Sequence, residues 1–156
     1  MQLFTIGGYG HTEETFVSRL KSNSIDLFVD IRARRGMRGR KYSFLNASRL
    51  QVALKEVNIA YLHLKNLAPS DDVRNAQRMA DAESDYTKRS RERLSDTFIS
   101  EYKSKVLQVV DRSEVLSLLA DFDCVCLFCV ESLPNACHRS IVTSWLEEET
   151  GPARHL

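Results

Sequence analysis

Residues that could do chemistry together lie close to one another near the C-terminal end of the sequence. Cys129 and Glu131 stand two residues apart, and Cys137 is followed directly by His138. A thiol beside an imidazole can act as a nucleophile with its own base, and a carboxylate can act as an acid, a base or an orienting group. This cluster predicts a catalytic site.

The elements around the cluster predict that it lies where a buried strand ends. Residues 124–130 are the most apolar run of the chain, which is typical of a parallel strand covered on both faces. A helical pattern follows, with Asn135 as the expected N-cap. Cys137 would then lie in the first helical turn, where backbone amides and the helix dipole favour anions. Arg139 and Ser140 are expected to bind phosphate there.

A metal site is an alternative interpretation of the same residues. Cys129, Cys137 and His138 could supply three ligands to zinc or iron and leave an open position for water. Their spacing differs from the paired Cys-x-x-Cys of zinc fingers. Neighbours on a helix also point apart, which argues against joint ligation by Cys137 and His138. Cys124 and Cys126 are expected to pack in the core.

A glycine-rich turn follows the first predicted strand, residues 3–6. The amides of Gly7, Gly8 and Gly10 could approach a phosphate, and His11 is a further candidate catalytic base. The third glycine of a dinucleotide-binding fingerprint is missing. A tight turn without a ligand is therefore an equal interpretation.

The second predicted strand, residues 25–31, leads into a basic loop. Between positions 32 and 41 the sequence has six positive charges and no acid, and the aromatic residues Tyr42 and Phe44 follow. Arginine binds phosphate with a planar fork and aromatic rings stack on bases, so the loop predicts contact with a nucleotide, DNA or RNA. A solvated basic loop is the alternative. The predicted binding residues here are Asp30, Arg32, Arg34, Arg35, Arg38 and Lys41.

Strand and helix patterns alternate along the rest of the chain. A third strand is predicted at 57–64, and helices are expected to begin at Ser95 and Ser113. The alternation predicts a single α/β domain over residues 1–156, a three-layer sandwich whose mostly parallel sheet is flanked by helices. Because parallel strands end at one edge of a sheet, the candidate residues should converge on a common cleft.

Composition limits the possible classes of protein. The 156 residues suit one domain, the formal net charge of +1 says nothing about possible partners, and no apolar run is long enough to span a membrane. All four cysteines lie between positions 124 and 137, which is unlike a disulfide framework and predicts a cytoplasmic protein. The charged stretch at about 71–95 is expected to be a peripheral helical excursion, either solvent-facing or a lid.

Five segments of the sequence carry a resemblance to a known family. They are Thr5-Ile6-Gly7 with His11, Asp30-Ile31-Arg32, Tyr61-Leu62-His63-Leu64, Cys129-Val130-Glu131 and Cys137-His138-Arg139-Ser140. Together they resemble the family catalogued as domain of unknown function 488. The resemblance spans nearly the whole chain and implies the α/β fold and the site positions, but no activity. It also adds Tyr61 to the expected phosphate- or nucleic-acid-binding residues.

Three hypotheses about function follow. The first is an enzyme that acts on a nucleotide or nucleic acid through a Cys/His/Glu/Arg site at the strand ends. The second is a zinc- or iron-dependent hydrolase or redox protein. The third is a non-catalytic nucleic-acid-binding module, in which the cysteines only pack.

Overall fold

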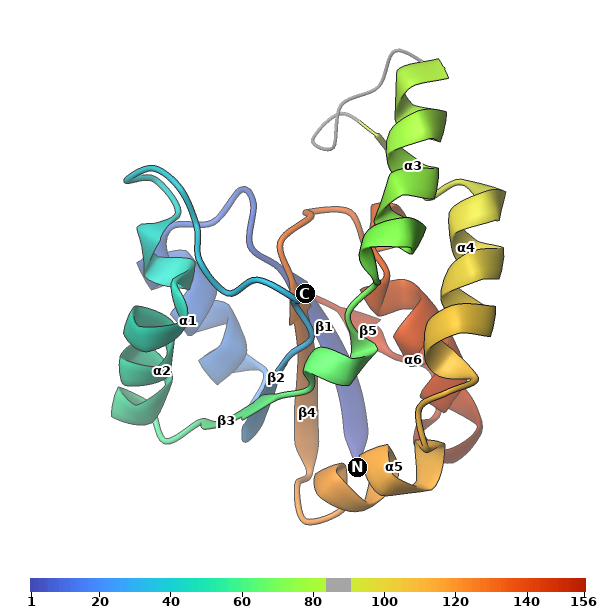
Figure 1. Ribbon diagram of the computed structural model, residues 1–156. Helices are drawn as coiled ribbons and strands as arrows, with labels where there is room; N and C mark the ends of the chain where they lie inside the picture. The colour runs from blue at the N-terminus through green and yellow to red at the C-terminus, as the bar shows by residue number, and fades with distance from the viewer. Residues whose placement is uncertain (84–90) are drawn as a thin grey trace.

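A parallel five-stranded sheet forms the centre of the molecule, as the computed structural model of residues 1–83 and 91–156 shows (Figure 1). The strands stand in the order β3-β2-β4-β1-β5, and every neighbouring pair is parallel. The predicted parallel sheet is confirmed. The strands are β1 (Gln2–Gly7), β2 (Leu27–Asp30), β3 (Ala60–His63), β4 (Cys124–Cys129) and β5 (Arg154–His155).

Helices cover both faces of this sheet, which confirms the three-layer α/β sandwich. α1 and α2 lie on one side and α4 and α6 on the other (Figure 1). On the first side, the ring of Phe16 from α1 packs edge-on against Phe28 and Phe128. The helices are α1 (Glu13–Ser22), α2 (Ala47–Glu56), α3 (Asp71–Glu83), α4 (Asp96–Tyr102), α5 (Arg112–Leu119) and α6 (Arg139–Thr150).

The order of the strands determines where loops can form a site. The chain runs outward from β1 through β2 to β3 on the α1–α2 side, then returns on the opposite side to β4 and β5. β4 lies between β1 and β2, so the loop after β4 emerges between their two loops. Open α/β sheets bind ligands at such a change of direction.

The local signals for helix starts are partly confirmed. Thr12 and Ser95 are N-caps, and their side chains accept hydrogen bonds from the amides of Thr15 and Phe98. The start predicted at Ser113 is wrong. Asp111 caps α5 instead, since its carboxylate accepts two amide hydrogen bonds.

The charged stretch forms a helix as predicted, but it is not merely peripheral. α3 packs along α4 and rises beside the carboxyl edge of the sheet (Figure 1). Residues 84–90 of the predicted 71–95 excursion lie outside the described residues. In residues 1–83 and 91–156, no helix has the length and apolar character needed to cross a membrane.

Candidate functional site

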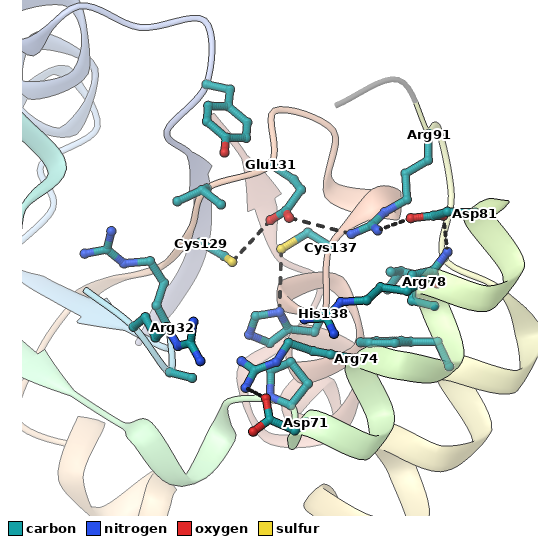
Figure 2. Close-up of a pocket in the computed structure, with 18 of the residues that line it drawn as sticks. Arg32, Asp71, Arg74, Arg78, Asp81, Arg91, Cys129, Glu131, Cys137 and His138 are labelled. Carbon is teal, nitrogen blue, oxygen red and sulfur yellow. Dashed lines mark hydrogen bonds and ion pairs between the residues drawn. The ribbon is translucent and has the colours of Figure 1, made fainter. Parts of the chain in front are cut away.

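A cavity of about 590 Å³ lies at the carboxyl edge of the sheet (Figure 2). Its walls come from the loop after β2, from the segment between β4 and α6, and from α3. The predicted catalytic cluster lies between Arg32 on one side and the arginines of α3 on the other (Figure 2). The charged and thiol-bearing lining residues are Arg32, Arg34, Asp71, Arg74, Arg78, Asp81, Arg91, Cys129, Glu131, Cys137 and His138.

The backbone between β4 and α6 brings Cys137 and His138 together. Residues Pro134–Ala136 form a separate 3-10 turn, Cys137 is extended, and His138 is the N-cap of α6. The Sγ atom of Cys137 lies 3.8 Å from Nδ1 of His138. The predicted N-cap at Asn135 is therefore wrong, and so is the expectation that these two side chains point apart, because Cys137 precedes the helix.

Cys129 and Glu131 share one face, as strand alternation predicts. The thiol of Cys129 donates to Oε2 of Glu131 over 3.3 Å. The other carboxylate oxygen lies 3.6 Å from Nη2 of Arg91, and Arg91 also pairs with Asp81 at 3.0 Å. Both Glu131 and Arg91 are at least nine-tenths buried at the side chain. Arg91 therefore holds the Glu131 carboxylate in place beside the cysteines.

A backbone carbonyl fixes the orientation of the His138 ring. Nε2 lies 3.2 Å from the carbonyl oxygen of Ile31, which can only accept a hydrogen bond. Nε2 therefore carries a proton, and Nδ1 faces the sulfur of Cys137. The ring of Tyr102 packs 5.6 Å away, centroid to centroid, on the same imidazole.

Opposing effects determine the protonation of this pair. Burial raises the pKa of the Cys137 thiol, but the hydrogen bond with Cys129, the charge and hydrogen bond of His138 and the charge of Arg139 bring that pKa well below its usual value. Burial lowers the pKa of His138, while Cys137 and Glu131 raise it above its usual value. Both shifts favour the charged forms of the two side chains.

Arg139 and Ser140 support the loop rather than face the cavity. The Arg139 side chain is 1% exposed and donates to the carbonyl oxygens of Glu131 and Ser132. The hydroxyl of Ser140 donates to the Cys137 carbonyl over 2.9 Å. Neither residue lines the cavity where phosphate binding was expected.

The glycine turn after β1 also supports this loop. A Cβ atom at Gly7 would overlap the carbonyl oxygen of Glu131. The amides of Gly8 and Tyr9 both donate to the Val130 carbonyl, at 3.1 and 2.9 Å. The amide of Gly10 donates to the Tyr42 hydroxyl over 3.3 Å. These three glycine positions, predicted to bind phosphate, thus have contacts within the protein.

His11 is not brought to the cysteine cluster. It lines a different depression, which it shares with His155, and its Nδ1 lies 3.4 Å from the Thr15 hydroxyl. Burial, together with the charge of Arg19, lowers the pKa of His11. The structure therefore separates this candidate base from Cys137.

Asp30 and Tyr61 hold Arg32 at the edge of the cavity. The guanidinium donates to both carboxylate oxygens of Asp30, at 2.9 and 2.7 Å, and stacks on the Phe128 ring. The hydroxyl of Tyr61 donates to the same carboxylate over 2.8 Å. Arg32 is 4% exposed, and its Nη1 has no hydrogen-bond partner among the described residues.

The rest of the basic loop divides into two parts. Arg34 lines the cavity, whereas Arg35 donates to the Tyr61 hydroxyl and neither Arg38 nor Lys41 reaches the lining. Phe44 is buried in the core, 5.8 Å from the Phe16 ring, so the expected base stacking by Phe44 is wrong. Only part of the predicted binding loop therefore faces the cavity.

Sequence reasoning missed the side of the cavity that α3 provides. Arg74 and Arg78 stand four residues apart, which places them on one helix face, and Asp81 continues that face. Arg91 follows at the other end of the excursion. The spacing was visible in the sequence, but it looked like a solvent-exposed helix with ion pairs.

Comparisons with known proteins identify a family but no individual relative. The sequence model of the family described as "Domain of unknown function DUF488" matches residues 12–146. No curated protein and no solved structure matches the chain.

Proposed function

The chain belongs to the family of domain of unknown function DUF488, and from its site we propose that it is an enzyme acting on a nucleotide unit. That unit is either a free nucleotide or one nucleotide of a DNA or RNA strand. The single observation that carries the proposal is that one cavity is lined both by arginines and by the Cys137–His138 pair.

The charges of the cavity favour an anionic substrate. Among the described residues, five arginines line it against three carboxylates, and the arginines belong to the loop after β2, to α3 and, in the case of Arg91, to the segment before α4. Nη1 of Arg32 is buried without a partner among the described residues. Phosphate oxygens are suited to such guanidinium groups, because each can accept charge-assisted hydrogen bonds.

The size of the cavity suits one nucleotide unit. Its volume of about 590 Å³ lies within the range of small-molecule sites. Phe98 adds an apolar surface to the lining against which a base could pack. A strand of DNA or RNA would enter with a single nucleotide, while the rest follows the exposed basic loop.

The reaction would take place at Cys137, His138 and Glu131. A thiolate at Cys137 can attack a substrate directly, or it can hold an ion that activates water. In both cases the arginines would bind the substrate, and Cys137, His138 and Glu131 would carry out the reaction on it. We further propose a cytoplasmic location, which is supported by four cysteines that form no disulfide.

Binding and turnover of mononucleotides and short DNA and RNA strands test this proposal. Cys137→Ser should abolish turnover, followed by chromatography of the products, and leave the dissociation constant within about threefold. Replacing Arg74 and Arg78 by glutamine should weaken binding at least about tenfold in calorimetry. The same change at Arg38 and Lys41, outside the cavity, is the matched control in the mononucleotide titrations, because only a strand would reach the exposed basic loop.

Two outcomes would contradict the proposal. If Cys137→Ser lowers affinity and turnover equally, Cys137 is not the reacting group. If no substrate is turned over and only the Arg38 and Lys41 variant weakens binding, the chain is a nucleic-acid-binding module.

A further inference from the structure

Three donor atoms in the cavity converge closely enough to share one ion, and we propose that Cys129, Cys137 and His138 bind zinc. The two sulfurs and a ring nitrogen of His138 all lie within 4.8 Å of one another, and all three residues are buried. Tetrahedral zinc, with Zn–S of ~2.3 Å and Zn–N of ~2.0 Å, separates its donors by about 3.5–3.8 Å. The separation of 3.8 Å between Cys137 and His138 already meets this requirement.

The hydrogen bonds of His138 favour ligation. Its Nε2 donates to the Ile31 carbonyl, so Nδ1 is the nitrogen that can offer a lone pair toward Cys137. Histidine ligands of metals usually donate their other ring N–H to a carbonyl or carboxylate. The protein therefore holds this imidazole in an orientation suited to a ligand before any ion arrives.

The types of ligand select the metal. Two thiolates and one imidazole favour zinc over the hard cations magnesium and calcium, which prefer oxygen. Three protein ligands with a fourth position open to the cavity are typical of catalytic rather than structural zinc. Cys126 on the same strand is not a candidate, because strand alternation points it to the opposite face and burial raises the pKa of its thiol.

Glu131 stands beside the open position. Its Oε2 is 3.3 Å from the sulfur of Cys129, and Arg91 holds the other oxygen. A water on the ion would give a proton to Glu131, and the resulting hydroxide would add to an electrophilic atom of the substrate. The leaving group would then take the proton from Glu131. This role rests on the proposed function, whereas zinc binding does not.

Elemental mass spectrometry of protein purified without a metal-affinity tag tests the site. We expect about one zinc per chain in the wild type, and less than about a tenth of that in Cys137→Ala and His138→Ala. Cys126→Ala is the matched control, since it also removes a buried thiol from the same region, and it should keep its zinc. Circular dichroism establishes which variants fold.

A measurement on the wild type alone does not depend on the folding of variants. After removal of metal with a chelator, cobalt(II) should bind and give the strong visible absorption of a tetrahedral ion with a thiolate charge-transfer band. Binding should release about two protons per ion, one from the Cys129 thiol and one from the Cys137–His138 pair. Glu131→Gln should keep the metal and reduce turnover at least about a hundredfold.

The outcomes separate this inference from the proposed function. Wild-type protein that holds no metal and takes up no cobalt overturns the zinc site, even if nucleotides still bind. Zinc retained by folded Cys137→Ala overturns it as well. Iron lost in the same variants would overturn the assignment to zinc while keeping the three ligands. Zinc without nucleotide binding supports the site and contradicts the proposed function instead.

Discussion

The turn after β1 and the loop after β4 start side by side, since Gly7 pairs with Cys129 in the sheet. Both follow a buried strand, both lead to a helix, and both contain a histidine. The loop after β4 brings its thiols and His138 into a cavity. The turn after β1 directs the amides of Gly8 and Tyr9 and the bare backbone of Gly7 toward the neighbouring loop.

The difference shows how the turn after one strand can hold the loop after a neighbouring strand in place. Because the amides of Gly8 and Tyr9 bind the Val130 carbonyl, the loop after β4 is held against β1 just where it leaves the sheet. Arg139 holds the same loop from the other side through the carbonyls of Glu131 and Ser132. The reacting side chains are thus placed by contacts of the loop backbone with Gly8, Tyr9 and Arg139, of which only Tyr9 lines the cavity.

The largest effect should come from Gly7→Ala. The added Cβ would overlap the Glu131 carbonyl and lie 3.0 Å from the Cα of Ser132, so backbone must move. We expect the free energy of unfolding in urea to fall by about 3 kcal/mol, because overpacked sites of this kind relax poorly. A change below about 1 kcal/mol would mean that the two loops are not in close contact.

Arg139→Gln should have the second largest effect. We expect it to lower the free energy of unfolding in urea by about 2 kcal/mol. The substitution leaves the buried carbonyls of Glu131 and Ser132 without their charged donor. Arg49→Gln is the control, because Arg49 forms an exposed ion pair with Glu13 that solvent screens and that should contribute little to stability. If the two substitutions had equal effects, Arg139 would not support the loop after β4.

The fold and the central cluster could be predicted from the sequence for physical reasons. A continuous apolar run such as 124–130 has few other solutions than a buried strand, and Cys129 and Glu131 must then share a face. Backbone geometry after the strand could not be predicted in this way. A 3-10 turn at Pro134–Ala136 moves the helix start past Asn135, and that shift decides where Cys137 points.

Contacts between segments that are far apart in the sequence could not be predicted either. The spacing of Gly7, Gly8 and Gly10 is compatible with a phosphate turn and with close backbone packing, and only the position of Val130 distinguishes them. The arginines of α3 have the spacing of a solvent-exposed face. They line the cavity because α3 packs on α4 beside the sheet edge, which no local pattern specifies.

Gly10→Ala should have a smaller effect than Gly7→Ala, although both lie in one turn. Gly10 has a φ of 91°, which an alanine adopts only with strain, but no atom of residues 1–83 and 91–156 lies within 4 Å of its Cβ position. We expect a loss of about 1 kcal/mol in unfolding free energy and an unchanged zinc content. Loss of zinc with this substitution would show that the turn contributes to the site directly.

The smallest effect should be a loss of stability on acidification that comes from the histidines on the β1 side, since the raised pKa of His138 acts in the opposite direction. Burial lowers the pKa of His155 in the folded protein, assisted by the charge of Arg139, and burial likewise lowers the pKa of His11. The unfolded chain therefore takes up these protons first as the pH falls. The corresponding loss of stability should begin near pH ~6.5 and level off below the folded pKa values.

Replacing His11 and His155 by glutamine tests this assignment. Unfolding free energies of the wild type and the double variant would be compared between about pH 7.5 and about pH 5. The double variant should lose less stability on acidification than the wild type, since neither state then takes up a proton at these positions. If the two proteins lose the same unfolding free energy, the acid sensitivity comes from other groups. These histidines would then not distinguish the two strand ends.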